Sequence, residues 1–197
     1  MTELITAFLE KNRIEKPGDL PLLLQTVSAI PWGEGRTIKE VLQTKNVGTC
    51  TGKHLVLQEC LHTLGIPFRS VACTFHWSEQ PISYPSKLRE ILHEGEWKHG
   101  HNFVQLRQGD KWIDIDITWD SFLQSYGFRS FPSHWDGNSF IGIQHILQRW
   151  DGISIAEKKR ELVASLTPEM SQRREYFLTL LIQWIGAIRR GGSSTQV

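Results

Sequence analysis

The chain lacks an excess of charge of either sign. Its 197 residues include 22 Lys plus Arg and 21 Asp plus Glu, which gives a formal net charge of +1. Because the charges are so closely balanced, the chain has no long-range electric field that would attract nucleic acid or an anionic membrane surface. We therefore expect neither nucleic acid nor membrane as a partner.

Long apolar runs and paired cysteines are also missing. No segment approaches the roughly 20 apolar residues that span a bilayer, and residues 1–11 lack the basic start and apolar centre of a secretory signal. The 3 cysteines cannot all pair within one chain, and their spacing contains no Cys-x-x-Cys pattern. Free thiols persist in reducing compartments, so a cytoplasmic location is expected.

The length and the hydrophobic content of 40% suit an ordinary globular protein. We predict a single domain over 1–197. It should contain a core at about 20–150, a C-terminal helical appendage at about 154–190 and a flexible tail at 191–197.

Cys50 lies where a thiolate is favoured. Residues 55–64 carry apolar side chains at helical spacing, and glycine and proline follow. Thr49 can cap this helix, so Cys50 should lie in its first turn. Unpaired N–H groups and the helix dipole stabilise an anion there and lower the pKa of a cysteine. Cys50 is therefore the candidate nucleophile, whereas Cys60 and Cys73 fit core positions.

A predicted hairpin about fifty residues later supplies a base. Residues 100–107 and 112–119 alternate between apolar and polar side chains, with a turn between them. His101 is on the first strand, and two acids, Asp114 and Asp116, are on the second. A cysteine nucleophile needs such a base, and the base needs an orienting partner.

The hairpin register selects between the two acids. A two-residue turn at 109–110 makes Asp116 the diagonal neighbour of His101 on one face, about 7–8 Å away between backbones. Asp116 is therefore the expected partner. The same register allows a rival pair, in which His99 lies opposite Asp120.

Three sequence segments share their order and spacing with a known superfamily. They are Gly48-x-Cys50, Gly65-Ile66-Pro67-x-Arg69, and His101 followed by Gly109-x-x-Trp112-x-x-x-Asp116-x-Thr118. Together, over about residues 46–120, they resemble the transglutaminase-like superfamily of papain-like thiol enzymes. The chain departs from the pattern at Gln105 and Ile117, where an acid and a proline are common.

The resemblance implies an α+β fold of the papain-like or transglutaminase-like kind. N-terminal helices and the nucleophile helix would pack on a small antiparallel sheet, and C-terminal helices would follow. It also implies that Cys50 is the nucleophile, His101 the general base and acid, and Asp116 the residue that orients the imidazole.

The expected activity is cleavage or transfer of an acyl group at an amide-type bond, with hydrolysis of a peptide or other amide favoured. No cofactor and no metal are expected. One alternative is a non-catalytic binding module of the same fold. Others are an arylamine-type acyltransferase, whose Arg-Gly-Gly-x-Cys segment is absent, and a cross-linking enzyme, although no EF-hand calcium loop is visible.

An acyl-transfer site also needs donors for the oxyanion. The backbone N–H of Cys50 is the natural first donor, because it belongs to the helix start. Gln43, Asn46 and Trp32 are the candidates for a second.

Other segments allow two interpretations each. Lys53 and His54 either add positive potential near the thiolate or are solvated. Residues 120–151 are predicted as loop and short helices, with aromatic residues that cover the sheet rather than line a groove. The last helix, ending at about Arg190, has an apolar stripe that packs on the domain or, alternatively, forms a dimer.

Overall fold

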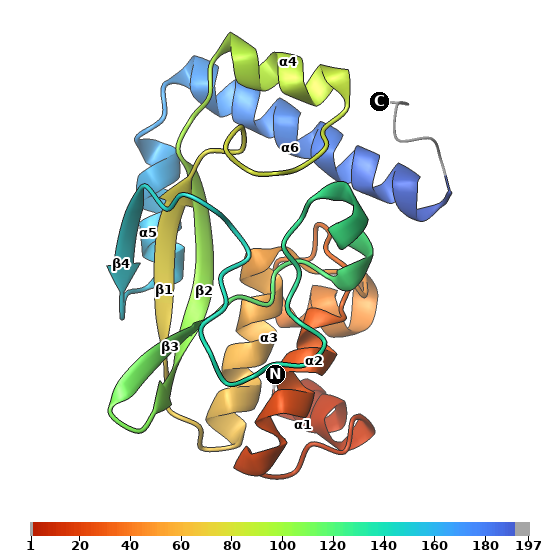
Figure 1. The fold of residues 1–197 in the computed structure, drawn as a ribbon, viewed down its shortest axis with the longest axis vertical. Helices are drawn as coiled ribbons and strands as arrows, with labels where there is room; N and C mark the ends of the chain where they lie inside the picture. Colours follow the sequence, from red (N-terminus) through yellow and green to blue (C-terminus); the bar gives the residue numbers. More distant parts are fainter. Residues whose placement is uncertain (1, 192–197) are drawn as a thin grey trace.

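The computed structural model describes residues 2–191 (Figure 1). The α-helices are α1 (Thr2–Lys11), α2 (Leu20–Ser28), α3 (Cys50–Thr63), α4 (Ser86–Glu94), α5 (Ile155–Ala164) and α6 (Pro168–Arg189). The strands are β1 (Phe68–Phe75), β2 (His99–Gln108), β3 (Lys111–Ile115) and β4 (Gln148–Asp151). Short helical turns occupy Pro17–Asp19, Glu40–Thr44 and Ser121–Tyr126. The α+β class predicted from the sequence is confirmed.

The strands form one antiparallel sheet in the order β3-β2-β1-β4. The predicted hairpin register is confirmed, because Gln108 pairs with Lys111. The second strand was predicted to continue to residue 119, but β3 ends at Ile115. The backbone N–H of Asp116 instead donates to the carbonyl of Phe140 at 3.0 Å, so the chain changes partner there.

Strand β4 was not predicted. Residues 148–151 pair with β1 at the edge of the sheet, within the segment expected to be loop and short helices. Three of its four residues are exposed. An edge strand of this kind has no alternating apolar pattern, which is the signal by which strands are predicted.

Hydrophobic residues form two clusters that meet at β2. Val104 and Leu106 belong to the cluster that contains the buried residues of α1, α2 and α3. Phe103 belongs to the other cluster, with buried residues of β1, α4 and α6. Successive residues of a strand point to opposite faces, so β2 separates the two clusters. In Figure 1, α4 and α6 lie together at the top and α1 to α3 lie below them.

The apolar stripe of α6 faces inward. Its buried residues are Phe177, Leu181, Trp184, Ile185 and Ile188, and they join the cluster with β1. The interpretation that this stripe packs on the rest of the chain is confirmed. A dimer through this helix stays a prediction, and residues 192–197 of the expected tail lie outside the described residues.

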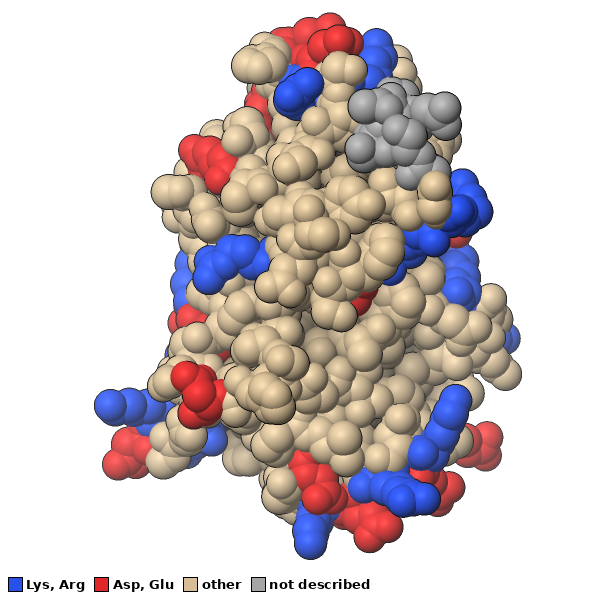
Figure 2. Space-filling view, turned by 45° about the vertical axis from the view of Figure 1, so that its right-hand side comes forward, with Lys and Arg blue, Asp and Glu red and all other residues tan. Residues whose placement is uncertain are grey.

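Charged residues are mixed over the surface. On the face in Figure 2, Lys, Arg, Asp and Glu lie mostly towards the edges, and the middle is largely uncharged. Over residues 2–191, no helix has both the length and the apolar character that crossing a bilayer requires.

Candidate active site

Cys50 is the first residue of α3, as predicted. The hydroxyl of Thr49 caps the helix by accepting from the backbone N–H of Gly52 at 3.2 Å. Thr49 also donates its own N–H to the carbonyl of Gly35 at 2.8 Å. A Cβ on Gly52 would lie 2.3 Å from that carbonyl oxygen, so only glycine allows the loop this close to the helix. These contacts fix the start of α3 and, with it, the position of the sulfur.

His101 and Asp116 meet as the register predicted. Nε2 of His101 lies 2.8 Å from Oδ2 of Asp116, and both side chains are buried. The carboxylate also accepts from the backbone N–H of Gly142 at 3.0 Å and from the hydroxyl of Thr118 at 2.6 Å. Burial alone would raise the pKa of Asp116, but the charge and hydrogen bond of His101 hold it well below its usual range. Asp116 is therefore a fixed anion behind the imidazole.

Cys50 and His101 line the same cavity, and each shifts the pKa of the other. Burial raises the pKa of the Cys50 thiol, but the positive charges of Lys159 and His101 outweigh it and lower the pKa to about 6. Burial likewise opposes protonation of His101, but Asp116 and the thiolate raise its pKa to about 9. Between these values the pair is a thiolate beside an imidazolium.

Lys159 is the site residue that the sequence analysis missed. It comes from α5, and its Nζ lies 3.3 Å from the sulfur of Cys50. The same ammonium donates to the hydroxyl of Thr51 and to the side-chain carbonyl of Asn102, both at 2.6 Å. Nothing in the sequence around residue 159 indicates a partner 109 residues away. α5 is thus part of the cleft, although it was expected to belong to an appendage.

His54 is a buried structural residue. Its Nε2 accepts from the backbone N–H of Ile117 at 3.3 Å, so its Nδ1 carries the proton that the carbonyl of Cys50 accepts at 2.7 Å. Burial lowers the pKa of His54 to about 4, so the ring is neutral. The solvated interpretation is wrong for this residue, and so is the interpretation that it adds positive potential.

Lys53 is also fully buried, so the solvated interpretation is wrong here too. Its Nζ donates to the carbonyls of Ser28 and Thr118, both at 2.9 Å. Burial lowers its pKa to about 7, against the opposing charges of nearby acids. The side chain therefore ties α2 and the segment after β3 to the helix that carries Cys50.

The rival acid–base pairs do not form. His99 is buried beside aromatic rings, and Asp120 instead accepts from the backbone N–H of Trp32 at 2.7 Å. The pairing of His99 with Asp120 was therefore wrong. Asp114 does not line the cleft and forms a salt bridge with Arg149 at 2.7 Å.

Beside Cys50 and His101 lies a cavity of about 560 Å³. Its walls include Trp32, while the other two candidates for the second oxyanion donor, Gln43 and Asn46, are exposed on the surface. The aromatic residues of segment 122–140 do not line it, because they pack in or against the two hydrophobic clusters or are exposed. Their predicted covering role is confirmed. Over the described residues, no three His, Cys, Asp or Glu side chains gather as a metal site would require.

Comparisons with known proteins add little. No protein-family model matches the sequence, and no curated protein matches it. One solved structure that is similar, described as "Crystal structure of a TGase", is 14% identical with a TM-score of 0.40. The alignment covers 62% of this chain and 32% of that chain. A likeness this remote is no argument for shared function, so the function depends on the geometry of the cleft.

Proposed function

We propose that this protein is a thiol enzyme of the transglutaminase-like kind, which cleaves an amide-type bond through Cys50, His101 and Asp116. The observation that carries the proposal is that Cys50 and His101 line one cavity and shift each other's pKa, while Asp116 is hydrogen-bonded to the imidazole. A base held by a third group beside a nucleophile at a helix start is the arrangement that covalent acyl transfer requires.

In the proposed reaction, the thiolate of Cys50 attacks the carbonyl carbon of the bound amide. The carbonyl oxygen becomes an oxyanion, whose donors we assign to the backbone N–H of Cys50 and to Trp32, the one of the three candidates that lines the cavity. His101 then gives its proton to the leaving nitrogen as the C–N bond breaks, and a thioester remains on the sulfur. Asp116 keeps the imidazole in position and balances its charge throughout.

Water completes the reaction. His101, now neutral, takes a proton from water as the oxygen attacks the thioester carbon. The C–S bond breaks, the acid leaves, and the thiolate and imidazolium are restored. We favour hydrolysis over transfer to an amine, because hydrolysis needs a binding site for the acyl donor alone.

Trapping the acyl-enzyme tests the proposal. Anilide, ester and thioester substrates are incubated with the protein, and mass spectrometry measures the adduct on the peptide that contains Cys50. Wild type should gain the acyl mass there and release product. Cys50→Ser should lose both signals and retain its circular dichroism spectrum.

Cys60→Ala is the matched control, because Cys60 is buried away from the cleft and burial raises its thiol pKa to about 12. This variant should keep the adduct and the turnover. An adduct that persists in Cys50→Ser would contradict the proposal. A product that forms only when an amine is added would replace hydrolysis by transfer.

A further inference from the structure

The cavity beside Cys50 has a one-sided charge that the molecule as a whole lacks. Five of its lining residues are Lys or Arg and none is Asp or Glu. They are Arg36, Lys98, Lys159, Arg160 and Arg174. Over residues 2–191, none of the five forms a salt bridge with a carboxylate, whereas Arg69, Arg149, Arg173 and Arg189 all do.

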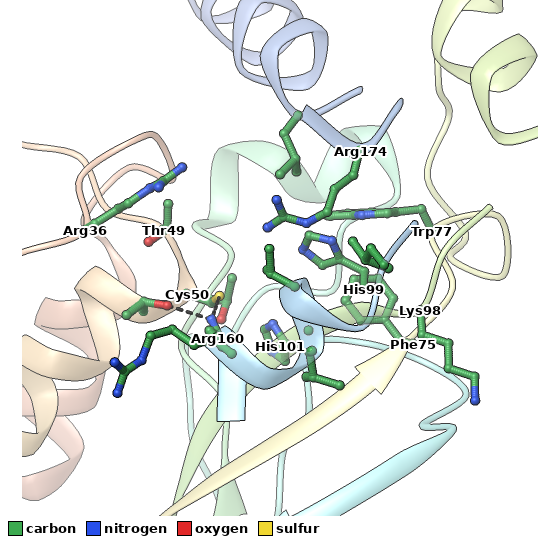
Figure 3. Close-up of a pocket in the computed structure, with 18 of the residues that line it drawn as sticks. Arg36, Thr49, Cys50, Phe75, Trp77, Lys98, His99, His101, Arg160 and Arg174 are labelled. Carbon is green, nitrogen blue, oxygen red and sulfur yellow. Dashed lines mark hydrogen bonds between the residues drawn. The ribbon is translucent and has the colours of Figure 1, made fainter. Parts of the chain in front are cut away.

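Two of these cations flank the cavity above the sulfur. In Figure 3, the guanidinium groups of Arg36 and Arg174 extend toward one another, with Cys50 below them, while Lys98 and Arg160 extend away from Cys50. Arg174 is half-buried, and burial, followed by the charge of Arg36, lowers its pKa. The two charges therefore repel each other in a partly desolvated place, and an anion between them would relieve that repulsion.

A buried indole packs in the same wall. Trp77 lines the cavity and is 2% exposed, and its indole N–H has no acceptor in the described part of the chain. Trp77 contacts Phe177, which is one helical turn after Arg174 on α6. A buried donor without an acceptor is uncommon and costs free energy. This nitrogen is enclosed by protein, so it is not one of the groups that would contact a ligand.

We propose that the cavity binds acyl substrates that carry an anionic oxygen group, a carboxylate or a phosphate, held between Arg36 and Arg174. This inference rests on the proposed function and names its substrate class. Both guanidinium groups donate hydrogen bonds and accept none. Guanidinium groups bind such oxyanions through short, charge-assisted and often bidentate hydrogen bonds. Apolar side chains, Phe75, Trp119 and Leu162 among them, also line the cavity and suit a hydrocarbon spacer or ring.

Two alkylating reagents test the anion site without any turnover. Iodoacetate and iodoacetamide both form an S–C bond at Cys50 and release iodide, but only iodoacetate carries a carboxylate. The measurement is the ratio of the iodoacetate rate to the iodoacetamide rate, taken at pH 7.5 and low salt. For Cys50 this ratio should exceed that of glutathione by about tenfold or more, as a cationic cleft concentrates anions.

Arginine variants locate the effect. Arg36→Gln and Arg174→Gln should each lower the ratio by about threefold or more. Arg173→Gln is the matched control: it lies on the same helix with the same loss of charge, but its side chain is bound to Glu169 and to the carbonyl of Gly95. A wild-type ratio equal to that of glutathione would overturn the proposal, as would an equal loss in the control.

Measuring the turnover of matched substrates distinguishes a carboxylate from a phosphate as the preferred anion. The probes are anilides of glutaric acid, of its monomethyl ester, and of 3-phosphonopropanoic acid. A preference of about tenfold or more in kcat/KM for an acidic probe over the ester, lost in Arg174→Gln, supports the proposal and identifies the anion. Equal cleavage of ester and acids overturns it. If no probe is cleaved while the alkylation ratio behaves as expected, the proposed function fails and the anion site stands.

Discussion

Lys159→Met removes the ammonium nearest to the sulfur of Cys50 and keeps a side chain of similar length. The charge now lies 3.3 Å from the sulfur and helps to hold the thiol pKa at about 6. Without it, His101 is the cation that still lowers this pKa, and burial opposes its effect. The pKa of Cys50 should therefore rise.

Coulomb's law gives the size of the change. Two unit charges 3.3 Å apart attract by about 1.3 kcal/mol at the dielectric constant of water and by about 5 kcal/mol at an effective constant of about 20. One pH unit in a pKa corresponds to about 1.4 kcal/mol. Even with water-like screening, the substitution should raise the Cys50 pKa by about one pH unit, and weaker screening would raise it further.

The assay is the rate of iodoacetamide alkylation at Cys50 from pH 4 to pH 10, because the thiolate is the reacting form. Lys158→Met is the matched control, since the ammonium of Lys158 pairs with Glu161 at 2.6 Å and lies over the ring of Trp150. The control should keep the wild-type midpoint. A midpoint for Lys159→Met within about 0.3 pH unit of wild type would refute the assigned role of this charge.

Three further predictions concern the pair, its acid and the helix cap. For an uncharged substrate, kcat/KM should rise as the pH passes about 6, because the thiolate of Cys50 forms there. It should fall as the pH passes about 9, because His101 loses its proton there. A value of kcat/KM that still increases at pH 10 would contradict the ion pair. Asp116→Asn should lower kcat/KM by roughly two to four orders of magnitude in a folded protein, because the amide cannot balance the imidazolium; an unchanged value in steady-state kinetics would remove this residue from the mechanism. Thr49→Ala should lower the free energy of unfolding by about 1 kcal/mol in urea denaturation, because the cap of α3 is lost. Thr26→Ala, whose hydroxyl bonds only within its own helix, should cost less.

The parts of the site that could be predicted depend on local or near-local patterns. The start of α3 follows from a capping residue before a helical apolar pattern, and both involve residues close to Cys50 in the chain. The meeting of His101 with Asp116 follows from a two-residue turn, because a hairpin register determines which side chains share a face. Both results needed no knowledge of distant contacts.

The rest depends on long-range packing. Lys159 reaches Cys50 because α5 lies against β1 and β2, and a solvent-facing lysine would have the same sequence neighbours. His54 is buried although its position in a polar first turn suggested exposure, since its partners come from the helix start and from the segment after β3. Strand β4, which was not predicted, has too few buried residues to be distinguished from a loop by its sequence.

The close approach of Gly35 to Gly52 has a consequence for how the cleft would recognise a ligand. The residue after Gly35 is Arg36, so the same backbone contact that anchors the helix start also positions the backbone of Arg36. The sulfur and the backbone of Arg36 then keep their spacing before any ligand arrives. Exchanging Arg36 alone should therefore change the substrate specificity. Alanine at Gly35 or Gly52 should disturb both ligand recognition and the chemical step.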